Sequence, residues 1–176
     1  MGQYYKVVFL SDRDGTEVIL LVLQPSRYCG SKLMEHAYQG NDMMNAVEDL
    51  IRPSGLMYRS RLVWAGDYAE PEPGQGTNLY EMADGCREVV VQPIKLLSFR
   101  YVVNHSKRVY VDKKRNTHED GIHPLPLLTA EGNGCGGGDY FGNESSACGT
   151  WARDSISVEN EIPQGYEEEV YSFTEL

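Results

Sequence analysis

The chain opens with two apolar segments around a short polar turn, and this pattern limits the fold more than any other feature. Residues 4–10 read YYKVVFL and residues 16–23 read TEVILLVL, both rich in β-branched or aromatic side chains. Asp14 and Gly15 supply the chemistry of a tight hairpin turn between them. The segments predict a β-hairpin, and because they are apolar on both faces we expect both strands inside a sheet.

Shorter elements are predicted along the rest of the chain. Asn41 can cap a helix whose apolar residues share one face and which Pro53 and Gly55 end. Asn78 with Glu81 has capping-box spacing before a brief helix that Gly85 ends. Further strands are expected in RLVWA (61–65), REVVVQ (87–92), SFRYVVN (98–104), RVYVDK (108–113) and TWARDSISVE (150–159). The prolines of IHPLPLLTAE (122–131) favour an edge strand or extended segment, and YEEEVYSF (166–173) a strand or short helix.

These elements predict one α+β domain over residues 1–176, with a mostly antiparallel sheet and two or three short helices. No apolar run reaches eighteen residues, so we expect no membrane span and no signal peptide. Four cysteines without a CxxC pair indicate reduced thiols, as in a cytoplasm. The histidines show no ligand spacing, so neither a metal site nor a cofactor is expected.

The net charge of −10 is concentrated at the end of the chain, where residues 126–176 carry Arg153 alone against ten acidic side chains. General binding along a nucleic acid needs a broad basic surface, and this balance argues against it. The acidic segment 160–176, with Glu167, Glu168 and Glu169, is either a solvated face or a surface for a basic protein. Oligomerisation stays open.

Residues 131–143 read EGNGCGGGDYFGN and form the most unusual stretch. Gly132, Gly134 and Gly137 match GxGxxG, but no helix follows them as a dinucleotide site requires, and no GK[ST] follows as a Walker loop requires. Two interpretations stay open: a nest of backbone N–H groups that holds an anion, or a flexible loop. Cys135 lacks the adjacent cation that would activate it as a nucleophile.

Two other segments could complete a site with this loop. WAGDY (64–68) lies where an apolar strand becomes a loop, and the hairpin NHSKRVYVDKKR (104–115) concentrates cations that suit a compact anion. The alternatives are that Trp64 packs in the core while Asp67 caps a turn, and that the lysines only protect a strand edge. The candidate ligand-binding residues are Trp64, Asp67, Tyr68, Asn104, His105, Lys107, Arg108, Gly136, Gly137, Gly138, Asp139, Tyr140, Trp151 and Arg153.

Several motifs together resemble an uncharacterised family of small bacteriophage and bacterial proteins. The motifs are GQYYK (2–6), KLMEH (32–36), VWAGDYA (63–69), NHSK (104–107), EGNG (131–134) and GGDY (137–140). The resemblance implies a phage-associated accessory protein in the bacterial cytoplasm, of a class that often counters host defence. It assigns no role to any residue.

The hypothesis is a protein that sequesters a small phosphorylated or nucleotide-type ligand, such as a defence signal, between these three segments. Two alternatives stay open. One is a phosphodiesterase-like hydrolase with His105 and Asp67 as acid–base partners. The other is an acidic inhibitor of a host defence protein.

Overall fold

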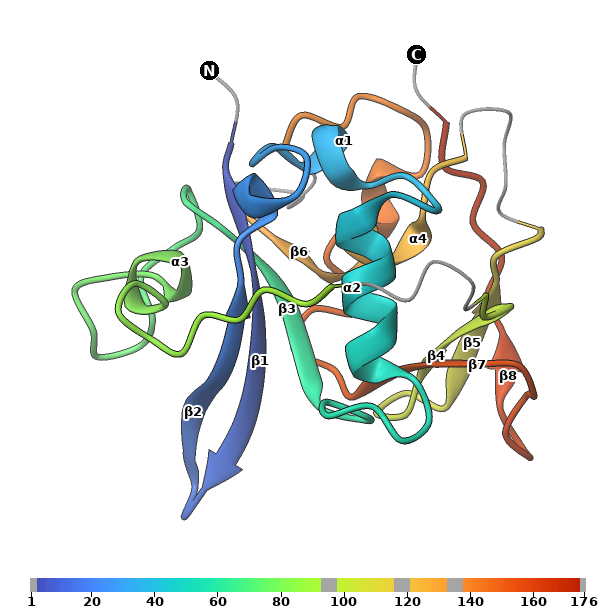
Figure 1. Ribbon diagram of the computed structural model, residues 1–176, viewed down its shortest axis with the longest axis horizontal. Coiled ribbons are helices and arrows are strands. Elements are labelled where there is room, and N and C mark those ends of the chain that lie inside the picture. The colour runs from blue at the N-terminus through green and yellow to red at the C-terminus, as the bar shows by residue number, and fades with distance from the viewer. Residues whose placement is uncertain (1–2, 93–97, 116–120, 133–137, 175–176) are drawn as a thin grey trace.

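The computed structural model describes residues 3–92, 98–115, 121–132 and 138–174, and it has an α+β fold with two four-stranded sheets (Figure 1). The first sheet has the strand order β2-β1-β3-β6. Its strands are β1 (Tyr5–Arg13), β2 (Thr16–Leu23), β3 (Arg61–Gly66) and β6 (Ala130–Glu131). β1 is antiparallel to β2 and β3, whereas β3 and β6 are parallel.

The second sheet has the order β7-β4-β5-β8. Its strands are β4 (Tyr101–Asn104), β5 (Val109–Asp112), β7 (Ile156–Glu159) and β8 (Glu167–Glu168). An antiparallel bridge between Arg61 and Ser155 connects the start of β3 to the segment before β7. The two sheets are therefore joined at one end of β3.

Short helices connect and cover the sheets. They are α1 (Leu33–His36), α2 (Asp42–Ile51), α3 (Leu79–Met82) and α4 (Pro124–Thr129), with 3-10 turns at Pro25–Arg27 and Ser145–Ala147. The predicted caps of α2 and α3 are confirmed, because the side-chain oxygens of Asn41 and Asn78 accept the N–H groups of Met44 and Glu81. No helix in the described ranges is long and apolar enough to cross a membrane.

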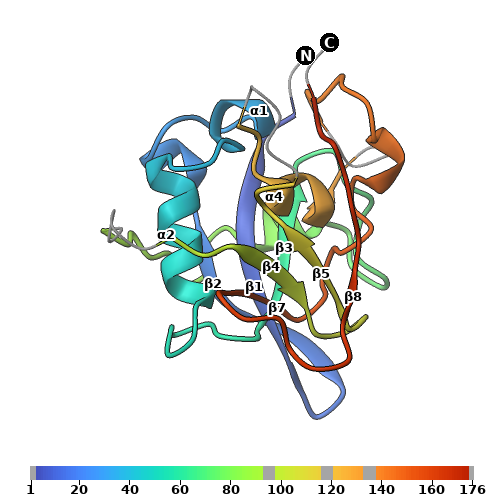
Figure 2. The same cartoon turned by 90° about the vertical axis from the view of Figure 1, so that its right-hand side faces the viewer.

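The core explains why the opening hairpin is apolar on both faces. Alternate residues of β1 enter two different clusters: Phe9 packs with α2 and the second sheet, and Leu10 packs with α3. Figures 1 and 2 show α2 on the side of the first sheet that faces the second sheet. The expectation that both hairpin strands lie inside the sheet holds for β1 but not for β2. β2 is an edge strand, and among the described residues another segment bridges to it only at Val22.

Two segment predictions are wrong, and the strand predicted over 150–159 is present only at Ile156–Glu159, because residues 150–153 form turns. Residues 87–92 do not form a strand; Glu88 makes an isolated parallel bridge to Val22. Residues 122–131 form mainly the helix α4, because Pro124 occupies its first turn, where a proline costs no hydrogen bond. His123 caps this helix by accepting the N–H of Leu125.

Candidate functional site

The end of β3 and the start of the glycine-rich segment lie side by side, because β3 pairs with β6. Trp64 pairs with Ala130 and Ala65 with Glu131 in the parallel β3–β6 ladder. A Cβ on Gly66 would lie 2.5 Å from the carbonyl oxygen of Glu131, so this close approach needs glycine. The sequence left open whether these segments meet, and the described start of the glycine-rich segment lies beside the end of β3.

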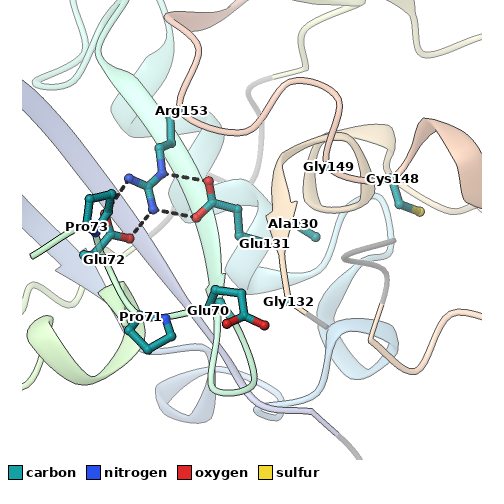
Figure 3. A pocket seen from close by; sticks show the side chains of 11 residues that line it. Glu70, Pro71, Glu72, Pro73, Ala130, Glu131, Gly132, Cys148, Gly149 and Arg153 are labelled. Carbon is teal, nitrogen blue, oxygen red and sulfur yellow. Dashed lines mark hydrogen bonds and ion pairs between the residues drawn. The ribbon is translucent and has the colours of Figure 1, made fainter. Parts of the chain in front are cut away.

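A cavity of about 480 Å³, here called the Arg153 pocket, opens at this place (Figure 3). Its walls are the loop after β3, the first residues of the glycine-rich segment and the turn before Arg153. Of the predicted site residues, Arg153 lines it. The lining residues are Ala69, Glu70, Pro71, Glu72, Pro73, Ala130, Glu131, Gly132, Cys148, Gly149 and Arg153.

Carboxylates surround the guanidinium of Arg153. Nε and Nη2 donate to the two oxygens of Glu131, each across 2.7 Å, and Nη1 donates to Glu17 across 2.9 Å. Nη1 also donates to Glu72 across 3.0 Å, and Nη2 donates to the other Glu72 oxygen. The hydrogen bonds with Glu72, and to a smaller degree those with Glu131, raise the pKa of Arg153.

The charge of this pocket is opposite to the one expected. Arg153 contributes one positive charge, whereas Glu70, Glu72 and Glu131 contribute three negative ones. Figure 3 shows Glu70 near Gly132, apart from the guanidinium. An anionic ligand would meet repulsion here, so the pocket suits a cationic group.

The described ends of the glycine-rich segment are held by the protein itself. Gly138 has a φ of +61° and lies against the Tyr5 ring, and Asp139 accepts the N–H of Met34 across 3.1 Å at the start of α1. Burial raises the pKa of Asp139. Tyr140 is buried with its ring edge-on to Phe173. Gly136 and Gly137 lie outside the described residues.

Neither tryptophan offers its ring to a ligand, because both side chains are completely buried. The indole N–H of Trp64 donates to Nε2 of His36 across 2.9 Å, and that of Trp151 donates to Glu169 across 3.0 Å. Asp67 accepts the N–H of Tyr4, the residue just before the neighbouring strand β1, across 3.0 Å. Tyr68 is 46% exposed at the surface.

The structure does not bring His105 and Asp67 together. The N–H of His105 donates to Ser155, which pairs with the first residue of β3, and Asp67 follows the last residue of β3. His105 and Asp67 therefore lie at opposite ends of β3. The six residues of this strand rise about 3.3 Å each, which separates the two residues by roughly 15–20 Å. The ring nitrogens of His105 form hydrogen bonds with Tyr166 and Ser157 instead. Burial is the main cause that lowers the pKa of His105 to about 4, and the positive charge of Arg59 adds to it.

The turn of the basic hairpin is also closed by internal bonds. Asn104 is completely buried, donates to Asp154 across 2.8 Å and accepts the N–H of Lys107 across 3.0 Å. The ammonium of Lys107 lies 3.0 Å from Asp154. Arg108 lies over the ring of Tyr166, with 5.6 Å from the guanidinium carbon to the ring centre.

The other end of this hairpin lines a more cationic hollow. Two adjoining cavities of about 380 and 430 Å³ share Gln39, Ser98 and Lys113, and together they are called the Lys113 groove. Arg100, Lys113 and Lys114 bring three cations to it. Its other lining residues are Gly40, Met44, Asn45, Glu48, Phe99, His123 and Asn160.

A buried triad forms the floor of the Lys113 groove. Oε1 of Glu48 accepts from the Lys113 ammonium and from Nε2 of His123, the latter across 2.9 Å. Nδ1 of His123 accepts the N–H of Leu125, so the ring is neutral with its proton on Nε2, and burial lowers its pKa. Burial alone would raise the pKa of Glu48, but its bonds with His123 and Lys113 lower it.

Most of this groove was not identified from the sequence. The sequence predicts the cations of the hairpin, but it indicates Lys107 and Arg108 as ligand-binding residues rather than Lys113 and Lys114. One available signal was Glu48, an acidic residue on the apolar face of α2.

Comparisons of the chain with protein-family models, curated proteins and solved structures found no match. Function is therefore inferred from the geometry of the two hollows. The Arg153 pocket suits a cationic group, and the Lys113 groove suits an anionic one.

Proposed function

We propose that this protein binds a small phosphorylated or nucleotide-type ligand in the Lys113 groove and holds it without cleaving it. The observation that carries this proposal is the presence of Arg100, Lys113 and Lys114 along one groove of a chain whose net charge is −10. A local cationic hollow on an acidic protein attracts a compact anion without general affinity for polyanions.

Arg100 is the cation of the groove best placed to bind a phosphate. Lys113 pairs with Glu48, and Arg100 pairs with Asp112 across 2.7 Å. The Arg100 side chain is 47% exposed, so part of its guanidinium can bind phosphate oxygens while Asp112 holds its position.

Polar amides and a suitable size support a ligand larger than phosphate. Gln39, Asn45 and Asn160 can bond to ribose hydroxyls or to the edge of a base. Each cavity lies within the usual range of ligand pockets, about 300–1,000 Å³. The site would therefore accept a mononucleotide or a comparable phosphorylated metabolite.

Sequestration fits the groove better than hydrolysis. His123 is 1% exposed and both of its ring nitrogens are bonded, and Glu48 is bonded to two partners. A general base needs an acceptor atom within reach of the ligand. The described residues of this groove place His123 and Glu48 in a structural triad instead. The resemblance to small phage proteins adds a context in which the ligand is a signal of host defence.

A thermal-shift panel of mono-, di- and cyclic nucleotides tests this proposal. A ligand present at a hundred times its Kd stabilises the folded state by about 2.7 kcal/mol, so at least one member should raise the Tm. Arg100→Gln should abolish that rise, and Arg108→Gln at the opposite end of β5 is the matched control. Chromatography should recover the ligand intact. A flat panel at millimolar ligand would exclude the proposal, and cleaved ligand would favour the hydrolase.

A further inference from the structure

The edge of β2 has an open half. At Val22 the edge is covered, because the Val22 N–H donates to Arg87 and its carbonyl accepts from Val89. Residues 16–19 pair with β1 alone within the described ranges, and the register of the ladder shifts at Leu20. Figures 1 and 2 show this end of the hairpin projecting beyond the neighbouring elements. Main-chain groups along residues 16–19 can therefore accept another strand.

Open edges usually carry features that prevent strand addition. Lysine, proline and covering segments are common protections. Residues 16–19 read TEVI and contain neither lysine nor proline. Their one charged side chain, Glu17, is paired with Arg61 and Arg153, and the irregular position of the ladder is the next residue, Leu20. Val18 and Ile19 are only half-buried. The sequence of this edge permits pairing with a further strand.

An apolar groove follows the same edge. A cavity of about 400 Å³ between the hairpin and α3 is lined by Leu10, Val18, Ile19, Leu79 and Met82, among others. The Met82 side chain is 37% exposed. Methionine adapts its shape to different apolar partners, so an aliphatic side chain would fit here.

The groove leads into the acidic Arg153 pocket. Glu72 and Pro73 line both hollows, and Glu17 lies at the groove. In the ion network of Arg61 and Arg153, two guanidinium groups face the four carboxylates of Asp12, Glu17, Glu72 and Glu131. The excess of negative charge is complementary to a basic side chain.

We propose that the open edge of β2 binds an extended segment of a basic partner protein, which adds a strand to the first sheet. An aliphatic side chain of that segment would occupy the apolar groove, and a lysine or arginine would lie at the Glu72 end. A second copy of this chain is a poor occupant, because each copy carries a net charge of −10 and would bring further carboxylates to this edge. The surface is separate from the Lys113 groove, so this proposal does not depend on the nucleotide proposal.

Three synthetic peptides test the proposal. The first is a peptide of ten residues. Alternate positions carry leucine, leucine, lysine and lysine in that order, and all other positions carry threonine. The second has glutamate in place of lysine, and the third is the first with N-methyl groups on alternate amides. Fluorescence anisotropy should show at least tenfold tighter binding of the first peptide than of either other, because they lack the charge or the main-chain donors.

Protein variants locate the binding. Met82→Lys places a cation in the groove and should weaken binding of the first peptide about tenfold, whereas Leu56→Lys, at a residue 67% exposed in the loop after α2, should leave it unchanged. The amide NMR signals of residues 16–19 should shift on titration. Absence of binding at millimolar peptide, equal binding of the lysine and glutamate peptides, shifts confined to other surfaces, or a dimer that Met82→Lys dissociates would each overturn the proposal.

Discussion

The indole N–H of Trp64 donates to Nε2 of His36 across 2.9 Å, in a core where neither side chain is exposed to solvent. Nδ1 of the same imidazole lies 3.2 Å from the carbonyl oxygen of Gly30. The ring is therefore neutral with its proton on Nδ1. Protonation of Nε2 would place two N–H donors against each other.

The pair predicts that the protein loses stability in mild acid. Burial lowers the pKa of His36 from 6.5 to about 4, so between these values the unfolded chain binds a proton that the folded chain does not. Stability is complete above pH 6.5 and falls as the pH approaches 4. At about 1.4 kcal/mol per pKa unit, the loss from His36 at pH 5 is about 2 kcal/mol. The lowered pKa values of His105 and His123 act in the same direction.

Urea denaturation at pH 7, 6 and 5 measures this loss, and Trp64→Phe provides a check on its cause. Without the indole donor, NMR titration should give His36 a higher pKa than in the parent protein. An unfolding free energy that stays constant from pH 7 to pH 5 would contradict the neutral buried imidazole.

Breaking the triad of the Lys113 groove should be costly. Lys113→Met leaves the buried Glu48 carboxylate with one partner fewer, and the loss of one member of a buried ion pair typically costs about 3–5 kcal/mol. Arg27→Met, at the exposed pair of Arg27 with Glu88, should change the unfolding free energy by less than about 1 kcal/mol. Equal effects of the two variants in chemical denaturation would refute a structural role for the triad.

Arg153 should be necessary to hold its three carboxylates together. Arg153→Met removes the cation between Glu17, Glu72 and Glu131, and we expect a loss of about 2–3 kcal/mol from charged hydrogen bonds. Added salt should recover part of the loss, because it screens the remaining repulsion. The measurement is denaturation of both proteins at 0.05 and 0.5 M NaCl. A loss that does not depend on salt would argue against the electrostatic explanation.

Gly66 should not tolerate a side chain. Its Cβ would lie 2.3 Å from the Gln3 amide and 2.5 Å from the backbone oxygen of Glu131, so Gly66→Ala should destabilise the fold by about 1–3 kcal/mol. Gly76→Ala is the control, because nothing lies within 4 Å of its Cβ position. Thermal denaturation should separate the two variants clearly, and similar Tm values would show that the β3–β6 contact yields readily.

Local signals predicted local structure well. The turn at Asp14 and Gly15 and the caps at Asn41 and Asn78 follow from side chains within a few residues, and all three are present. α4 was missed because its prolines were interpreted as strand residues, although a proline in the first helical turn is tolerated. Residues 87–92 have strand-forming side chains but gain only a bridge to β2.

The candidate sites depended on pairings that a linear pattern does not contain. Glu48 meets Lys113 and His123 across 65 and 75 residues, and Arg153 meets Glu17 across 136. The sequence could show that Arg153 is the one cation of the last third, but not that carboxylates from other segments surround it. This pairing makes the predicted anion site acidic and leaves the Lys113 groove as the cationic hollow.

Chemical-shift mapping tests the central claim most directly. The nucleotide that stabilises the protein most in the thermal-shift panel is titrated into ¹⁵N-labelled protein, and the amide shifts are followed. If the ligand binds in the Lys113 groove, the largest shifts fall on Gln39, Ser98, Arg100, Lys113 and Lys114. Largest shifts at Glu72, Gly132 and Arg153, or no shifts at millimolar ligand, would contradict it.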